Sequence, residues 1–270
     1  MKKTVLITGA SSGFGRETAK LFDENGWNVI ATMRSPEKET ELTMLGNVLV
    51  TKLDVTDTQS IQNAVATGID KFGGIDVLVN NAGYGAFGEL ESASEEEIRK
   101  QFDVNLFGLI AVTQAVLPGM REKRSGVVIN VSSVGGRITF PYCSLYHATK
   151  FAVEGLTESI QYELNQFGIR AKIIEPGGYK TEFAGRSMSV FNADGPEDYK
   201  PSFEHFMKII ENWPMSDKLS EVADAIYEAA TDGTEKLRYP ADAHAAELIQ
   251  TRNQMGDVEF KKMMATQFSI

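Results

Sequence analysis

The sequence predicts an α/β protein built on one doubly wound, mostly parallel sheet of about seven strands with helices on both faces. Short β-branched runs alternate along the chain with amphipathic stretches of helical length. Most of these runs are apolar nearly throughout, as expected for parallel strands that are covered on both faces. No repeat, low-complexity tract or linker interrupts the 270 residues, so we expect a single domain over 1–270.

The order of the elements follows from these runs and from the residues that end them. Strands are expected at 4–9, 28–32, 48–54, 75–81, 126–133, 169–176 and 236–240. Helices are expected near 14–25, 58–72, 94–120, 146–167 and 219–231. Ser94 and Glu97 form a capping box at the start of the third helix. The glycines that stand where helix C-termini are expected are Gly26, Gly73, Gly168 and Gly233.

Residues 182–218 break the alternation and are rich in aromatic residues, Met, Gly and Pro. They follow the sixth strand, and loops that leave the carboxyl ends of strands bind ligands in this class of fold. We therefore expect a helical insertion whose residues 182–215 form a mobile lid over a substrate. An apolar stripe at helical spacing, expected to pack on the sheet, comprises Phe203, Phe206, Met207 and Ile210. The residues outside that stripe that we expect to contact substrate are Phe183, Met188, Phe191 and Trp213.

Composition excludes several classes of function. The net charge of −10 argues against a nucleic-acid or anionic-membrane partner, since both need basic surfaces. Cys143 is the only cysteine, which excludes an intrachain disulfide and a zinc cluster, and no metal is expected. The longest apolar helical stretch, 106–120, contains Gln114 and Pro118 and is shorter than the roughly 20 residues that span a bilayer. A cytoplasmic protein is expected.

The first strand runs directly into a glycine-rich turn with Gly9, Gly13 and Gly15. Glycines allow backbone amides to approach a pyrophosphate, and the following helix points its positive end at that anion. A tight strand-to-helix turn alone would also favour glycine. The position directly after an N-terminal strand favours a nucleotide site and a Rossmann-type sheet.

The end of the second strand carries Met33 and Arg34, with no acidic residue before Glu37. A carboxylate at this place would accept the ribose 2′-hydroxyl of NAD, whereas it would repel the 2′-phosphate of NADP. Arg34 instead offers a planar fork of donors suited to phosphate. The alternative is an arginine that is simply solvated at the surface.

The fourth strand ends in Asn80-Asn81-Ala82-Gly83. Asn and Gly are turn residues, so this segment is explained by a turn alone. The same residues also offer amides and carbonyls to an adenine or a ribose, or brace the neighbouring strand ends.

Tyr146 and Lys150 share one helix face at i, i+4 and form a candidate acid–base pair, because a nearby ammonium lowers the pKa of a phenol. Read in isolation, such a pair is also typical of a helix surface. Ser133 ends the fifth strand, where its hydroxyl can contact a substrate oxygen, and Ser132 is its competitor on the opposite face. Cys143 is either a substrate contact or a small packing residue.

Seven motifs together resemble the short-chain dehydrogenases/reductases over residues 3–185: TGASSGFG, LDVTD, NNAG, VNLFG, VSS, YHATK and PGGYKT. Within that family the chain is similar to NADP(H)-linked carbonyl reductases and 17β-hydroxysteroid dehydrogenase-like members. The resemblance implies that Tyr146 donates the proton, Ser133 polarises the carbonyl, Lys150 holds the nicotinamide ribose and Asn105 ties in a water relay. His147 departs from the usual choice after the tyrosine and is expected on the helix surface, turned away from the site.

The cofactor positions follow from the same resemblance. The turn of Gly9, Gly13 and Gly15 would hold the pyrophosphate, Asp54 would meet the adenine, Asn81 the adenosine ribose and the segment 176–181 the nicotinamide. The further residues expected to line the cofactor are Ser11, Ser12, Phe14, Arg34, Val55, Ala82, Gly83, Pro176, Gly177 and Thr181.

These observations imply an NADP(H)-dependent oxidoreductase that interconverts a ketone or aldehyde and its alcohol, with NAD(H) as the alternative cofactor. Rivals are an NADH-preferring alcohol or hydroxysteroid dehydrogenase and a regulator that senses a dinucleotide without turning it over. Such a regulator has no need of Ser133, Tyr146 and Lys150 together. The resemblance also implies a homodimer or homotetramer paired through the helices that carry Asn105 and Tyr146.

Overall fold

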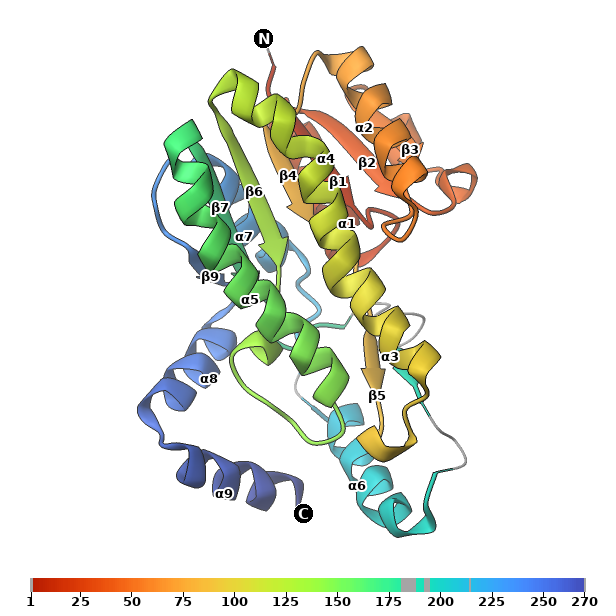
Figure 1. Ribbon diagram of the computed structural model, residues 1–270, viewed down its shortest axis with the longest axis vertical. Helices are drawn as coiled ribbons and strands as arrows, with labels where there is room; N and C mark the ends of the chain where they lie inside the picture. The colour runs from red at the N-terminus through yellow and green to blue at the C-terminus, as the bar shows by residue number, and fades with distance from the viewer. Residues whose placement is uncertain (1, 181–187, 192–194, 214, 270) are drawn as a thin grey trace.

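The computed structural model describes residues 2–180, 188–191, 195–213 and 215–269. Its centre is a seven-stranded parallel sheet in the order β3-β2-β1-β4-β6-β7-β9 (Figure 1), which confirms the predicted fold class. The strands are β1 (Thr4–Thr8), β2 (Asn28–Met33), β3 (Val48–Lys52), β4 (Val77–Asn80), β6 (Gly126–Val131), β7 (Ile169–Glu175) and β9 (Arg238–Pro240). The chain order reverses beside β1, between β1 and β4, which is where such sheets bind ligands.

Helices cover both faces of the sheet. On one face, α1 (Gly13–Glu24) and α7 (Ser220–Thr231) bury Phe22 and Ile226 against alternate residues of β1 and β2. On the other face, α2 (Thr58–Phe72), α4 (Gly108–Lys123) and α5 (Ser144–Leu164) pack over Leu6 and Leu78. The predicted helix boundaries differ by a few residues, and the capping box of Ser94 and Glu97 is present.

One long helix is assembled from α3 (Glu95–Phe102), a π-helical turn (Asp103–Phe107) and α4. The whole helix, Glu95–Lys123, has 29 residues, which is long enough to span a bilayer. The expectation that the apolar stretch 106–120 is too short to do so was therefore wrong. The helix is long and apolar enough to cross a membrane by length and composition only. The core helix of a soluble protein meets the same two criteria. About a third of its most apolar window is buried.

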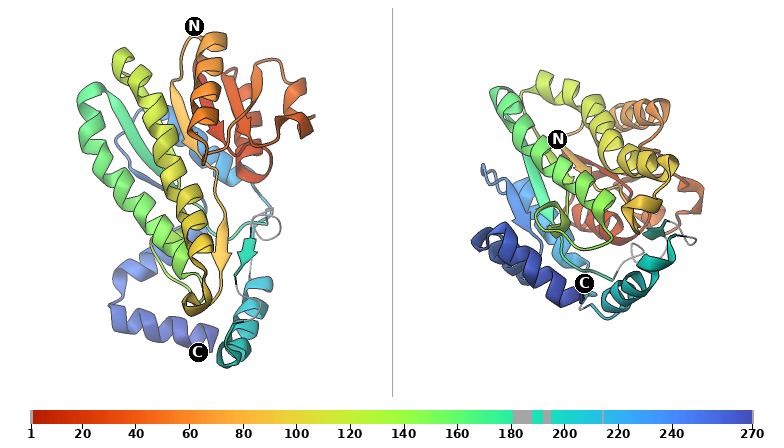
Figure 2. Two further views of the ribbon diagram at one scale, coloured as in Figure 1. Left: turned by 45° about the vertical axis from the view of Figure 1, so that its right-hand side comes forward. Right: turned by 60° about the horizontal axis from the view of Figure 1, so that its bottom comes forward.

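Elements beyond the carboxyl edge of the sheet extend the molecule (Figure 2): a short parallel pair, β5 (Gly85–Phe87) with β8 (Met188–Val190), and the helices α6 (Lys200–Glu211), α8 (Ala243–Gln254) and α9 (Asp257–Phe268). The expected apolar stripe lies on α6, but it does not pack on the sheet. It contacts α9 and the segment before α5, where Phe206 is fully buried beside Phe268 and Tyr142. These elements therefore enclose space over the strand ends.

Candidate active site

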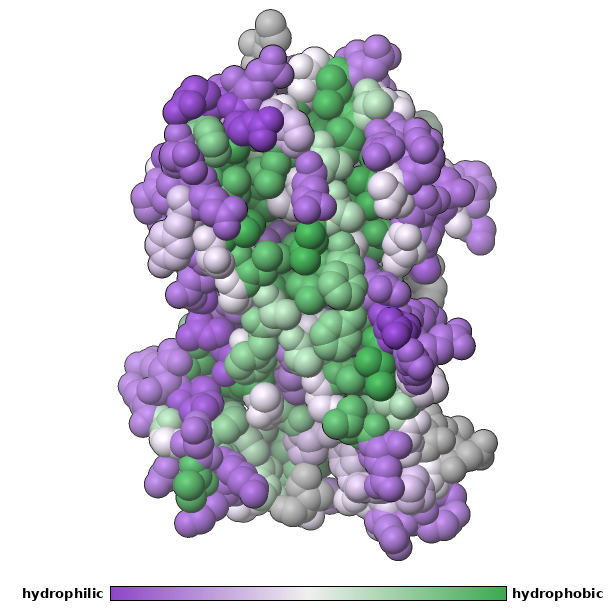
Figure 3. Space-filling view, viewed as in Figure 1, coloured by the Kyte–Doolittle hydropathy of each residue, from purple (hydrophilic) through white to green (hydrophobic). Residues whose placement is uncertain are grey.

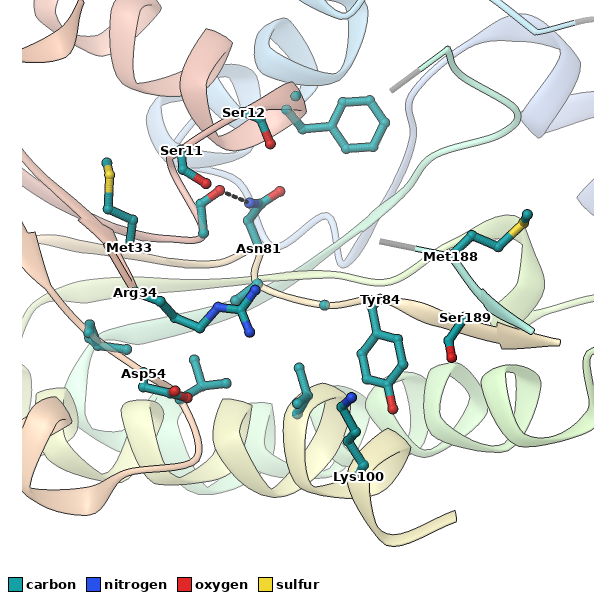
Figure 4. A pocket seen from close by; sticks show the side chains of 18 residues that line it. Ser11, Ser12, Met33, Arg34, Asp54, Asn81, Tyr84, Lys100, Met188 and Ser189 are labelled. Atoms are coloured by element: carbon teal, nitrogen blue, oxygen red, sulfur yellow. Dashed lines mark hydrogen bonds between the residues drawn. The ribbon is translucent and has the colours of Figure 1, made fainter. Parts of the chain in front are cut away.

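A pocket of about 440 Å³ lies at the carboxyl ends of β1 to β4 (Figure 4), and we call it the strand-end pocket. The predicted cofactor residues that line it are Gly9, Ser11, Ser12, Gly13, Phe14, Arg34, Asp54, Val55, Asn81, Ala82 and Gly83. Lys100 and Val104 on the long helix line its other side, and sequence reasoning missed both. Val104 stands in the VNLFG motif that placed its neighbour Asn105 in the site, whereas no motif pointed to Lys100.

The turn between β1 and α1 is shaped by close backbone approach. A Cβ atom on Gly15 would lie 2.5 Å from the Gly9 carbonyl oxygen, and one on Gly9, whose φ is +69°, would lie 3.0 Å from Ala82 Cα. Ser12 is the N-cap of α1, so the positive end of that helix lies at the pocket. A turn of this shape, with exposed amides and a helix N-terminus, fits a pyrophosphate.

Asn81 braces this turn. Its Nδ2 donates to the Gly9 carbonyl oxygen at 3.2 Å (Figure 4) and to the Thr8 carbonyl oxygen at 2.9 Å. Its backbone amide donates to Thr8 Oγ1 at 3.0 Å. Of the alternatives for the NNAG segment, bracing of neighbouring strand ends is therefore the one observed. Asn81 nevertheless lines the pocket.

Arg34 extends into the strand-end pocket from the end of β2 (Figure 4). It is exposed, and it makes no hydrogen bond or ion pair with any residue that the structure describes. Arg16 on α1 differs, because it pairs with Glu39 at 2.9 Å and Glu41 at 3.4 Å. Among the described residues, Arg34 is thus a cation of this pocket that is free to meet an anionic group.

A second pocket of about 220 Å³ adjoins the first and shares Phe14, Asn81, Gly83 and Met188 with it. We call it the apolar pocket. The predicted residues that line it are Ser133, Cys143, Tyr146, Lys150, Pro176, Gly177, Met188 and Trp213. Tyr179, in the segment predicted to meet the nicotinamide, also lines this pocket, and lining residues that were not predicted include Phe87, Val134, Phe140, Ile210 and Leu248. The two cavities place the predicted cofactor residues beside the predicted catalytic ones.

Ser133 and Tyr146 both line the apolar pocket, and the Ser133 hydroxyl is near enough to the phenol to act on its pKa. Lys150 follows one turn later on α5, with Nζ 5.8 Å from the centroid of the Tyr146 ring and donating to the Val131 carbonyl at 2.9 Å. Ser132 has a buried hydroxyl beside Gly136 with no hydrogen-bond partner among the described residues. The geometry therefore favours Ser133 over Ser132 as the partner of the tyrosine.

Burial dominates the electrostatics of this pair. It raises the pKa of Tyr146 to about 12, although the nearby Ser133 hydroxyl acts in the opposite direction. The expected lowering of that pKa by Lys150 is not found: Lys150 is not among the causes of the shift, and its ammonium is directed at the Val131 carbonyl. Burial also lowers the pKa of Lys150 to about 8, with the Glu154 carboxylate opposing that shift. A phenol with a raised pKa keeps its proton at neutral pH, so Tyr146 is protonated there.

Asn105 lies in the π-helical turn of the long helix and is buried. Its Oδ1 accepts from the Tyr84 amide at 3.0 Å, and its Nδ2 donates to the Tyr84 carbonyl and to Thr149 Oγ1 at 2.8 and 3.2 Å. The side chain thereby joins the segment after β4 to α5 at the residue before Lys150. The extra residue of the π turn re-aims one side chain without ending the helix.

Two predicted positions, Phe191 and His147, differ in the structure, and two others lie outside the described residues. Phe191 does not line the apolar pocket. It is 1% exposed and packs with Ala86 and Leu145, because the β5–β8 pairing places its ring against Gly88. Phe183 and Thr181 lie outside the described residues. His147 is buried in the first turn of α5 and lines the apolar pocket, so the expectation of a surface histidine was wrong.

Comparison with known proteins agrees with this geometry. The family model for short chain dehydrogenases matches residues 3–189. A 3-ketodihydrosphingosine reductase of Bacteroides thetaiotaomicron is 43% identical over 208 residues, covering 77% of this chain and 75% of its own. Human retinol dehydrogenase 8 is 39% identical over 209 residues, covering 72% and 66%. A short-chain dehydrogenase structure from Streptomyces avermitilis has a TM-score of 0.85 at 32% identity, covering 100% and 96%.

Similar chains have been solved with either nicotinamide dinucleotide. ElxO with NADP bound has a TM-score of 0.74 at 30% identity, covering 89% of this chain and 98% of its own. A 3-ketoacyl-(acyl-carrier-protein) reductase of Brucella melitensis complexed with NADH has a TM-score of 0.75 at 25% identity, covering 90% and 98%. A nicotinamide dinucleotide is therefore consistent with the strand-end pocket of this chain.

Proposed function

Because the chain belongs to the short-chain dehydrogenase family of oxidoreductases, we propose that it is an NADP(H)-dependent reductase of bulky, weakly polar ketones or aldehydes. The observation that carries this proposal is the placement of Ser133 and Tyr146 together in an apolar pocket that adjoins the strand-end pocket. Carbonyl reduction needs a proton donor and a hydroxyl that polarises the carbonyl, and Tyr146 and Ser133 can serve these two roles.

The choice of NADP rests on charge. Arg34 and Lys100 both line the strand-end pocket, and β2 ends without a carboxylate that would accept a ribose 2′-hydroxyl. A 2′-phosphate beside Arg34 would gain charge-assisted hydrogen bonds. The turn of Gly9 and Gly15 would hold the pyrophosphate.

When bound, the reduced nicotinamide supplies the hydride. The residues of the chain do the rest: Ser133 Oγ donates a hydrogen bond to the carbonyl oxygen and Tyr146 Oη donates a proton to it as the alcohol forms. Lys150 Nζ, 5.8 Å from the centroid of the Tyr146 ring, would place a positive charge beside the phenol. Asn105 holds α5 in register with the segment after β4.

The substrate class follows from the lining of the apolar pocket. Aromatic and aliphatic side chains of Phe87, Phe140, Trp213 and Leu248 surround the Ser133–Tyr146 pair. Burial of apolar substrate surface there is favourable, whereas a polyhydroxylated substrate would lose hydrogen bonds to water. Two similar proteins, a 3-ketodihydrosphingosine reductase and a retinol dehydrogenase, support the same proposal.

A homo-oligomer is part of the proposal. Figure 3 shows hydrophobic residues gathered over α4 and α5, and Phe107 and Phe151 are 57% and 45% exposed there. An apolar surface of this kind is typical of an interface between subunits. Light scattering of the wild type against Phe107→Glu would test it, with a monomeric wild type as the contrary outcome.

The test of the activity is oxidation of NADPH by the purified protein with a panel of aromatic, alicyclic and small polar ketones. We expect turnover of the apolar members, with higher kcat/KM than for the small polar ones. Tight binding of NADPH without turnover of any carbonyl would favour the dinucleotide-sensing alternative.

A further inference from the structure

His147 connects two segments of the apolar pocket to the catalytic helix. It directly follows Tyr146 on α5 and is 4% exposed. Its ring Nδ1 lies 2.7 Å from the Gly135 carbonyl oxygen, and its Nε2 lies 2.8 Å from the Phe140 amide nitrogen. Both ring nitrogens are therefore used by the backbone of the segment between β6 and α5.

The partners decide where the ring proton resides. A carbonyl oxygen only accepts, so Nδ1 carries the proton, and a backbone amide only donates, so Nε2 accepts. Burial lowers the pKa of His147 to about 4, which keeps the ring neutral at physiological pH. A second proton on Nε2 would face the Phe140 amide hydrogen. The ring is thus a fixed bridge and has no proton to exchange with a substrate.

The Gly135 end of the bridge leads to the catalytic serine. The Gly135 amide donates to Ser133 Oγ at 3.0 Å, so the same residue touches both His147 and Ser133. A Cβ atom on Gly135 would lie 3.1 Å from His147 Nδ1 and 3.1 Å from Tyr146 Cε1. The turn that carries Ser133 is therefore clamped between the rings of Tyr146 and His147.

The Phe140 end of the bridge leads to the substrate wall. The Phe140 ring lines the apolar pocket, 5.5 Å from the His147 ring centroid and 6.0 Å from that of Trp213. Trp213 in turn stacks on Phe268 at an interplanar angle of 4°. Holding the Phe140 backbone thus fixes one edge of an aromatic wall.

We propose that His147 is a positioning residue with two separable effects: through Gly135 it orients Ser133 for the reacting carbonyl, and through Phe140 it sets the shape of the apolar pocket. The kinetic part of this inference rests on the proposed carbonyl reduction.

Two amide variants separate the effects. In His147→Asn the amide nitrogen replaces Nδ1 but the side chain is too short to reach Phe140. In His147→Gln the amide oxygen replaces Nε2 while the donor to Gly135 is given up. Losing one neutral hydrogen bond corresponds to about a fivefold effect. His147→Asn should therefore raise KM for a bulky apolar ketone about fivefold at nearly constant kcat.

His147→Gln should lower kcat about fivefold at nearly constant KM. His205→Gln, at an exposed position of α6, is the matched control and should change neither constant. His147 would be merely structural if the variants changed the melting temperature but neither kcat nor KM. The same would follow if both amide variants lost kcat and KM to the same extent.

Ring ¹⁵N NMR of the wild type reports which ring nitrogen of His147 carries the proton, and this measurement does not depend on turnover. The chain has three histidines, and the signals that disappear in His147→Gln identify this one. We expect a protonated Nδ1 and an unprotonated Nε2 from about pH 5.5 to 8. An Nε2–H tautomer, or titration near pH 6.5, would overturn the bridge. A wild type without carbonyl turnover would overturn the proposed function and the kinetic role, whereas the tautomer would still report the two contacts.

Discussion

Arg34→Ala should remove most of the preference for NADPH over NADH. The arginine is exposed at the end of β2, lines the strand-end pocket and has no hydrogen-bond or ion-pair partner among the described residues. Its replacement should therefore leave the fold and NADH binding unchanged. Hydrogen bonds to charged groups contribute roughly 1.5–3 kcal/mol, and exposure to solvent places this one near the lower end. That energy corresponds to about a tenfold loss of NADPH affinity.

The assay is kcat/KM for both cofactors at two salt concentrations, in wild type, Arg34→Ala and Lys38→Ala. Lys38 is exposed, lies four residues further along the chain and does not line the pocket, so its removal changes net charge equally without touching the site. The wild-type preference should shrink at higher salt because an exposed charge pair is screened. Equal losses for NADH and NADPH in Arg34→Ala, or a wild type that prefers NADH, would refute the reasoning.

Three further predictions concern the turn, the buried histidine and the apolar wall. Gly15→Ala would place Cβ 2.5 Å from the Gly9 carbonyl oxygen. The free energy of unfolding should fall by about 1–3 kcal/mol, and NADPH should bind more weakly. Thermal melts should show no such loss for the control Gly119→Ala, whose Cβ would meet nothing within 4 Å. The folded pKa of His147, about 4, lies below its ordinary value of 6.5, so its contribution to the free energy of unfolding is fully present above about pH 6.5 and is lost as pH falls towards 4. That loss amounts to about 3 kcal/mol, and urea titrations should show a shallower pH dependence for His147→Gln than for wild type. Trp213→Ala should raise KM for bulky apolar ketones about tenfold by removing buried contact area while leaving small ketones nearly unaffected; an equal rise for both would place Trp213 outside the substrate contacts.

The parallel sheet and its flanking helices were predictable because their signals are local. An apolar β-branched run followed by an amphipathic stretch needs no knowledge of distant residues, and the capping box of Ser94 and Glu97 is contained within four positions. The glycine turn was equally readable, since Gly9 has a positive φ that favours glycine and Gly15 meets the Gly9 carbonyl.

The outer wall of the apolar pocket was not predictable because it is assembled from segments far apart in sequence. β5 and β8 have three residues each, too few to show a period of two, and they pair across about a hundred residues of chain. That pairing decides that Met188 lines the pocket and Phe191 does not. Phe140 and Leu248 enter through a loop and through α8, which carry no motif.

Burial explains the two errors at the centre of the site. His147 shares the first turn of α5 with Tyr146, and the sequence gives no sign that the Gly135 and Phe140 backbone groups lie within reach of its ring. The Tyr146 pKa was expected to fall beside Lys150, whereas desolvation, which depends on the packing of the whole pocket, raises it.

The kcat of Tyr146→Phe with NADPH and an apolar ketone tests the central claim most directly. The variant loses only the phenolic hydroxyl, so the ring contact with Phe87 and the binding of NADPH should remain. General acid catalysis contributes about 10² to 10⁴ in rate, and kcat should fall by at least the lower figure while the NADPH dissociation constant stays within about twofold. A Tyr146→Phe enzyme with near wild-type kcat would contradict the assignment of Tyr146 as the proton donor.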